Sequence, residues 1–119
     1  MSESISKKQP LESMPGQFLF SKDLLHEEIE VLLNLGIKTI ALFPNIPENL
    51  KDADGTNALN EQNFICKLVS EIKDRYPEVV LITDVALDPY TISGHDGIIK
   101  NDVVDNDLTL EALEKMAVN

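Results

Sequence analysis

The sequence lacks a second cysteine, a long hydrophobic run and a hydrophobic start, and each absence narrows what the protein can be. Cys66 is the single cysteine, so no internal disulfide can form, and we expect a reducing compartment, the cytoplasm. No apolar run approaches the roughly 20 residues that cross a bilayer. Residues 1–10 are polar, which is unlike the apolar core of a secretory signal.

Basic residues are also scarce. The chain has 10 Lys and Arg against 21 Asp and Glu, which gives a net charge of −11. Such a charge disfavours nucleic acid and an anionic membrane as partners. A chain of 119 residues with 43% hydrophobic and 26% charged residues is typical of one small globular domain. It is less than half the roughly 250 residues of a complete eight-stranded α/β barrel.

The first half of the chain predicts an arm, a turn, a helix and a strand. We interpret residues 1–12 as a loose N-terminal arm and residues 13–16, Ser-Met-Pro-Gly, as a turn. Ser21 is a candidate N-cap and Gly36 a candidate C-terminal cap of a helix between them. The apolar face of this helix is Leu25, Ile29, Leu32 and Leu33. Residues 37–43 are β-rich and predict a buried strand.

The second half repeats the pattern around two long polar connections, 44–60 and 88–106. Asn60 is a candidate cap of a second helix, residues 79–87 predict a second buried strand, and a last helix starts near Asp107. The second helix has an apolar face formed by Phe64, Ile65, Leu68, Val69 and Ile72. The last helix has one formed by Leu110, Leu113 and Ala117.

The order helix, strand, helix, strand, helix is typical of an α/β fold with parallel strands. Both long connections follow a strand, whereas the connections that precede the strands are short. In parallel α/β folds, the loops that follow the strands build the active site. We therefore expect both long connections to lie at one functional face.

Three carboxylates follow or interrupt the second strand, and they are the candidates for chemistry: Asp84, Asp88 and Asp96. Asp84 interrupts an apolar run, and a buried carboxylate is costly unless it is paired or metal-bound. The three groups suit a hard cation such as Mg²⁺ or a cationic substrate. The alternative is that Asp88 and Asp96 are turn residues and that Asp84 pairs with a nearby donor.

Other reactive side chains give weaker signals. His95 lies between Gly94 and Gly97, where it is either a ligand or base or simply a loop residue. We interpret His26 as a surface residue of an acidic helix face and Cys66 as an unreactive thiol. The sequence has no P-loop, dinucleotide-binding glycine motif, CxxC or serine nucleophile elbow.

Several segments together resemble one family. They are Ser-Met-Pro-Gly at 13–16, Leu-Gly-Ile at 35–37 leading to Ala-Leu-Phe-Pro at 41–44, Lys-Asp-Ala-Asp-Gly at 51–55, Ile-Thr-Asp-Val-Ala-Leu-Asp-Pro-Tyr-Thr at 82–91, Gly-His-Asp-Gly at 94–97, and Asn106-Asp107 with Thr109 and Leu113. Over about residues 10–115, the chain is similar to the porphobilinogen synthase (5-aminolevulinate dehydratase) family. The aspartate-rich run at 82–91 is the most specific of these segments.

The resemblance implies a barrel enzyme, a homo-octamer when complete, that condenses two 5-aminolevulinate molecules into porphobilinogen, a hydro-lyase step of tetrapyrrole synthesis. One branch of the family binds catalytic zinc through three cysteines, and the matching positions here are Ala86, Asp88 and Asp96. Without thiolates, the resemblance implies the branch that is often magnesium-dependent. It makes Asp84, Asp88 and Asp96 the active-site residues, with Asp88 and Asp96 as candidate metal ligands.

Two departures from the family pattern stand out. Ser93 occupies a position where the family usually has His. The family forms Schiff bases through two lysines on later barrel strands, and Lys38, Lys51 and Lys100 match neither motif. Residues 13–119 therefore look like about two β/α units of a (β/α)8 TIM barrel, and we expect no turnover from this chain alone.

Two further hypotheses remain open. A self-contained acidic α/β signalling module, such as a phospho-acceptor receiver domain, fits the length, the charge and the strand-end Asp84. Against it, the sequence predicts only two strands, whereas a fold of that kind has about five. The other hypothesis is a gene product without activity, which would persist as an unstable or associating fragment.

Overall fold

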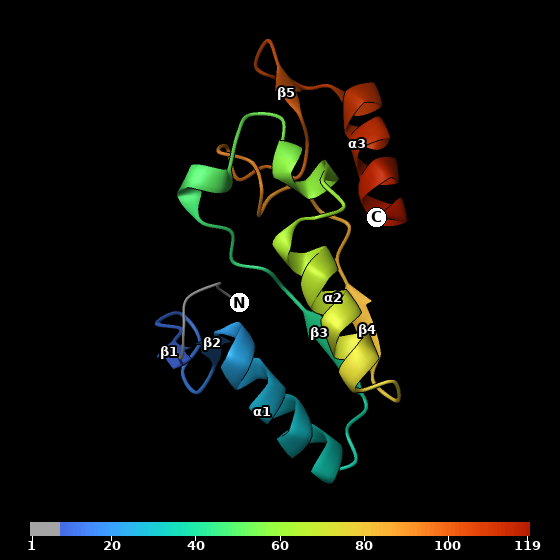
Figure 1. Ribbon diagram of the computed structural model, residues 1–119. Coiled ribbons are helices and arrows are strands. Elements are labelled where there is room, and N and C mark those ends of the chain that lie inside the picture. The colour runs from blue at the N-terminus through green and yellow to red at the C-terminus, as the bar shows by residue number, and fades with distance from the viewer. Residues whose placement is uncertain (1–7) are drawn as a thin grey trace. The chain divides into compact units, whose positions relative to one another are not determined.

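A computed structural model describes residues 8–119, which form two compact units (Figure 1). The first unit contains residues 8–45 and Leu68–Thr83, and the second contains Ile46–Lys67 and Asp84–Asn119. The helix α2 (Phe64–Arg75) runs from the second unit into the first. In the part of the chain that is described, no helix is long and apolar enough to cross a membrane.

The first unit opens with a hairpin of β1 (Lys8–Pro10) and β2 (Phe18–Phe20), which pair antiparallel. The predicted Ser-Met-Pro-Gly turn joins them, and Gly16 adopts φ +84° there. The Lys8 ammonium lies 4.4 Å from the centre of the Phe18 ring. Residues 8–10 are thus a paired strand and not the loose arm expected over residues 1–12; residues 1–7 of that arm lie outside the described residues.

The first predicted helix is confirmed as α1 (Lys22–Asn34). Ser21 occupies the N-cap position, but its side chain does not cap the helix, and its hydroxyl donates to Asp23 Oδ1 at 2.5 Å instead. At its other end Gly36 adopts φ +81°, and the Ile37 amide donates to the Leu32 carbonyl at 2.9 Å, which closes the helix with a Schellman-type bond. Leu25 and Ile29 are buried as predicted. The prediction for His26 is wrong, because this side chain lies in the buried face of α1 and the residue is only 6% exposed.

The two predicted strands pair in parallel, as expected, but both are shorter. They are β3 (Thr39–Leu42) and β4 (Val80–Thr83), with Thr39 opposite Val80. The predicted burial is wrong for both strands. In β3 only Leu42 is buried, and in β4 Val80 and Ile82 are 55% and 53% exposed. These two side chains share one face of the strand, since alternate residues point the same way. The strand predicted over residues 79–87 ends at Thr83, so Asp84 follows the strand instead of interrupting it.

The second unit contains two short 3₁₀ helices, η1 (Glu48–Leu50) and η2 (Thr56–Leu59), followed by a hairpin that the sequence analysis missed. The hairpin pairs β5 (Ile99–Lys100) with β6 (Val103–Val104). Its two turn residues, Asn101 and Asp102, both adopt positive φ (52° and 62°), as tight hairpin turns between twisted strands require.

The last helix is α3 (Asn106–Val118), capped by the Asp105 carboxylate, which accepts from the Leu108 amide at 3.1 Å. Its predicted apolar face is only partly right. Thr109 and Ala112 are buried, while Leu110 is 56% exposed. The cap of α2 also differs from the prediction, because Asn63 and not Asn60 accepts from the first-turn amide of Cys66, at 2.9 Å.

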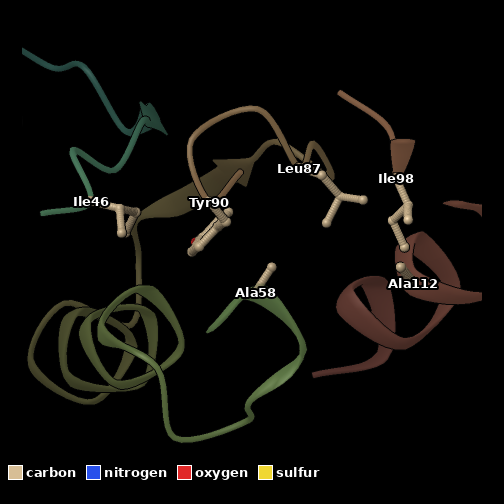
Figure 2. Close-up of a cluster of buried hydrophobic side chains, with 6 residues drawn as sticks. All are labelled: Ile46, Ala58, Leu87, Tyr90, Ile98 and Ala112. Carbon is tan, nitrogen blue, oxygen red and sulfur yellow. The ribbon is translucent and has the colours of Figure 1, made fainter. Parts of the chain in front are cut away.

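A hydrophobic core holds the second unit together. Figure 2 shows its members, which are Ile46, Ala58, Leu87, Tyr90, Ile98 and Ala112. They come from the connection after β3, from the connection after β4 and from α3. The two long connections therefore share one core.

Candidate active-site loop

The candidate carboxylates lie on the segment of residues 84–98, which we call the aspartate loop. Asp84 and Asp88 are exposed, and neither forms a hydrogen bond or ion pair among the described residues. The prediction that Asp84 is a buried carboxylate within a strand is therefore wrong. Its side chain is open to solvent directly after β4, where it can attract a cationic group without a desolvation penalty.

Asp96 differs from Asp84 and Asp88 because its carboxylate forms a hydrogen bond. Its Oδ1 accepts a hydrogen bond from the Leu87 amide at 2.5 Å, across nine residues of the loop. A short bond of this kind to a carboxylate is among the stronger hydrogen bonds in proteins. The loop is therefore closed on itself near its two ends, and Asp88 lies within the closed part.

The three carboxylates do not converge. Within residues 8–119, no three His, Cys, Asp or Glu side chains are grouped so that they could hold a metal ion. The side chains of Asp88 and Asp96 offer carboxylate oxygens, Ala86 offers no ligand atom, and none of the three carries sulfur. Oxygen ligands suit a hard cation that keeps several waters, and they do not suit a thiolate zinc site.

The remaining predicted candidates take structural positions. The His95 residue is exposed, and its backbone oxygen accepts from the Thr91 hydroxyl at 2.9 Å. Burial raises the pKa of the Cys66 thiol, which lowers its reactivity at neutral pH, in line with the prediction for this residue. Neither side chain contacts a candidate carboxylate through a hydrogen bond within the described residues.

Two buried residues of the aspartate loop were not singled out as site candidates from the sequence. Tyr90 and Thr91 are each only 1% exposed, although they lie in a loop. Burial raises the pKa of Tyr90 to about 12, so its hydroxyl stays protonated at neutral pH. The signal that was available is the aromatic and β-branched pair directly after Asp88 and Pro89, which is unusual in a solvated turn.

Asp52 was also missed as a site residue. The Asp52 amide donates to the Tyr90 carbonyl at 3.2 Å, and the Ile92 amide donates to the Asp52 carbonyl at 3.0 Å. Its carboxylate accepts from the amides of Asp54 and Thr56, at 3.1 Å and 2.9 Å. The Thr56 amide is the main reason why the pKa of Asp52 is lowered. The Asp-Gly turn at 54–55 was recognised in the sequence, but its long-range partner was not visible there.

Comparisons with known proteins identify one family. The model of the family described as delta-aminolevulinic acid dehydratase matches residues 1–119. A relative of that name from Chlamydia pneumoniae is 46% identical over 110 residues, covering 92% of this chain and 33% of the relative. The chloroplastic delta-aminolevulinic acid dehydratase of Glycine max is 41% identical over 111 residues, covering 92% of this chain and 27% of the relative.

A solved structure agrees with these relatives. The delta-aminolevulinic acid dehydratase (porphobilinogen synthase) of Toxoplasma gondii ME49, determined in complex with the reaction product porphobilinogen, superposes with a TM-score of 0.92 at 34% sequence identity. The match covers 97% of this chain and 33% of that one. The chain thus spans about a third of the length of the first of these relatives and of the solved structure.

Proposed function

This chain belongs to the delta-aminolevulinic acid dehydratase family, and from that membership we propose that it supplies the aspartate-bearing part of an active site that condenses two 5-aminolevulinate molecules into porphobilinogen. The observation that carries the proposal is the family match over the whole chain, which includes the aspartate loop after β4. The receiver-like hypothesis is not favoured by these findings. The strands of residues 8–119 form three two-stranded sheets, whereas that hypothesis needs one sheet of about five strands.

The fold proposed for the complete enzyme is a (β/α)8 TIM barrel, of which this chain contributes about two β/α units. The parallel pairing of β3 with β4 supports this proposal, because barrel strands run parallel. The exposed Val80 and Ile82 also support it, since a barrel strand has neighbours on both sides and a covered face. The homo-octameric assembly of the complete enzyme and a cytoplasmic location are part of the same proposal.

The proposed role of the aspartate loop is electrostatic. 5-Aminolevulinate carries an ammonium group, and the exposed carboxylates of Asp84 and Asp88 provide negative charge where the loop leaves the sheet. For the metal, we propose Mg²⁺ with Asp88 and Asp96 as ligands, because that ion is often held by one or two carboxylates and several waters. No step of the reaction is assigned to this ion.

The family forms Schiff bases through two lysines, and no segment of this chain that resembles the family contains them. In this chain, two lysines are paired with carboxylates: Lys51 Nζ lies 2.6 Å from Glu48, and Lys100 Nζ lies 2.7 Å from Asp54. Their ammonium groups are therefore occupied on the surface instead of being presented as free amines to a substrate ketone. We propose that the 119-residue chain has no turnover by itself.

A chimera provides the test. Residues 10–115 of this chain would replace the matching third of the Chlamydia pneumoniae relative, and porphobilinogen would be assayed with 5-aminolevulinate and Mg²⁺. We expect the chimera to form product, and we expect the 119-residue chain alone to form none and to give no adduct on borohydride trapping. Asp84→Asn in the chimera should lower kcat/KM by at least about tenfold, as the loss of a charged substrate contact does.

The controls separate the two parts of the proposal. Glu27→Gln in the chimera removes one exposed negative charge from α1, far along the chain from the aspartate loop, and should leave turnover unchanged. A chimera that folds but forms no porphobilinogen would overturn the proposed function. Product formed by the 119-residue chain alone would overturn only the proposal that this chain lacks turnover.

A further inference from the structure

The aspartate loop is joined to the connection after β3 by two backbone hydrogen bonds, both formed by Asp52. Asp52 and Thr91 form an isolated parallel bridge, in which Asp52 bonds to the residues on both sides of Thr91. The two bonds are the Asp52 amide to the Tyr90 carbonyl, at 3.2 Å, and the Ile92 amide to the Asp52 carbonyl, at 3.0 Å. Asp52 therefore fixes the path of the aspartate loop at its midpoint.

The side chain of Asp52 shapes the turn that makes this bridge. Its Oδ1 accepts from the amides of both Asp54 and Thr56, which folds residues 52–56 back on themselves. The fold brings Gly55, at φ +64°, against the aspartate loop. A Cβ atom built on Gly55 would lie 3.3 Å from Leu87 Cδ2 and 3.4 Å from Thr91 Cγ2, so the turn packs directly on both residues.

The contacts continue from these two residues to Asp96. The Thr91 hydroxyl donates to the His95 carbonyl at 2.9 Å, which positions the backbone next to Asp96. The Leu87 amide donates to Asp96 Oδ1 at 2.5 Å. Both residues that Gly55 contacts thus bond to the His95–Asp96 end of the loop.

We propose that Asp52 is a positioning residue for the aspartate loop: its carboxylate folds the 52–56 turn, the turn packs on Leu87 and Thr91, and these two residues hold the His95–Asp96 end of the loop in place. The proposal rests on the proposed function in that it assigns a purpose to the position of Asp96. Asp52 itself bonds to backbone groups and is not a residue that touches substrate or metal.

The test uses the 119-residue chain and three variants. Asp52→Ala removes the acceptor, whereas Asp52→Asn keeps a side-chain oxygen that can accept the same two amides. Asp54→Ala is the matched control, because Asp54 lies in the same turn and carries the same charge, but its carboxylate pairs with Lys100 at 2.7 Å and not with the turn. Amide resonances of α3 report whether each variant keeps the fold of the second unit, which contains Asp52 and the aspartate loop.

The main readout is the rate at which the Leu87 amide exchanges with solvent, followed by NMR at neutral pH. An amide that donates a hydrogen bond is protected from exchange, so the Leu87 rate reports the bond to Asp96. Asp52→Ala should speed Leu87 amide exchange by about tenfold, as loss of supporting hydrogen bonds predicts. Asp52→Asn and Asp54→Ala should both stay close to wild type. A general loss of stability would not produce this selective pattern.

The outcomes separate the inference from the function. If Asp52→Ala leaves the Leu87 exchange rate unchanged, or if Asp54→Ala speeds it equally, the positioning role is wrong. A second measurement adds Mn²⁺ as a paramagnetic probe for the proposed magnesium site, and the amides of Asp88 and Asp96 should broaden in wild type and less so in Asp52→Ala. Absence of broadening in wild type would overturn the proposed metal ligands, while the Leu87 exchange rate would still decide the role of Asp52.

Discussion

His26 on α1 and Glu71 on α2 meet through Nε2 and Oε1 at a distance of 3.0 Å. Lys22 pairs with the same glutamate. On the other side of His26, the Tyr76 ring lies 5.7 Å away, and its hydroxyl donates to Glu30 Oε1 at 2.9 Å. In the first unit, the two helices are therefore joined by charged and aromatic contacts around a buried imidazole.

This network predicts a pH-dependent stability. The hydrogen bond from Lys22 is the main cause that lowers the pKa of Glu71 below its ordinary value of 4.5. Because the pKa is lower in the folded state, the carboxylate stabilises the fold above that value, and its contribution is lost as the pH falls through the folded pKa. Glu71→Gln should lower the free energy of unfolding by no more than about 1 kcal/mol at neutral pH, since the glutamate is partly exposed.

The difference between wild type and Glu71→Gln should shrink as the pH falls below the ordinary pKa of 4.5, as measured by urea denaturation followed by circular dichroism. Glu27→Gln provides the comparison, because Glu27 is an exposed residue of the same helix pair without an ion pair among the described residues. A Glu71→Gln deficit that stays constant from neutral to acidic pH would contradict the electrostatic explanation.

Removing the hydroxyl group should change the free energy of unfolding in opposite directions at the two tyrosines. The Tyr90 hydroxyl is buried and has no hydrogen-bond partner among the described residues, whereas the Tyr76 hydroxyl donates to Glu30. Tyr90→Phe should raise the free energy of unfolding by up to about 1 kcal/mol, and Tyr76→Phe should lower it by about 1 kcal/mol. Thermal melts of the two variants check this, and a loss of stability in Tyr90→Phe would mean that its hydroxyl has a partner.

Much of the fold could be predicted because helices are local. The spacing of Ile65, Leu68 and Ile72 identified the buried face of α2, and all three are buried. The same reasoning failed at α3, where the face contains Thr109 and Ala112. Thr109 is buried because its hydroxyl accepts from the Ile98 amide at 3.0 Å, a contact with another part of the chain that helical periodicity does not reveal.

The candidate site could be located but not assembled from the sequence. Asp88 and Asp96 were placed in the loop that follows the second strand. Asp84 was placed inside that strand, because the apolar run continues to Leu87, past the end of β4 at Thr83. The bonds that shape the loop, from Asp52 to the residues around Thr91 and from Leu87 to Asp96, join positions that no periodic pattern connects. His26 was misplaced for the same reason, because its burial depends on Tyr76, fifty positions further along the chain.

The N-cap residue of α2 differs between the sequence prediction and the structure. Asn63 accepts from the Cys66 amide at 2.9 Å and donates from its side chain to the Ala58 carbonyl at 3.3 Å. The Asn60 side chain instead accepts from the Gln62 amide, before α2 begins. Asn63→Ala should lower the free energy of unfolding by about 1–2 kcal/mol, as loss of a helix N-cap does, and Asn60→Ala by clearly less. Equal losses in urea denaturation would restore Asn60 as the cap.

Gly55 offers the sharpest test of the packing beneath the aspartate loop. Gly55 and Gly94 both adopt positive φ, +64° and +68°, so alanine at either position meets a backbone penalty of about 1 kcal/mol. Only at Gly55 does the new Cβ also press on Leu87 and Thr91, at 3.3 Å and 3.4 Å, while nothing lies within 4 Å at Gly94. The close contacts must move by a few tenths of an ångström, and they belong to Leu87, whose amide donates to Asp96, and to Thr91, whose hydroxyl donates to the His95 carbonyl.

Gly55→Ala should therefore destabilise the protein more than Gly94→Ala, by roughly a further 1 kcal/mol, and it should also disturb the Leu87 amide. Gly94→Ala should show the backbone penalty without that disturbance in the same denaturation and NMR experiments. Equal losses in the two variants would mean that the 52–56 turn only lies near the aspartate loop, and that the contact with Leu87 and Thr91 relaxes without consequence for Asp96.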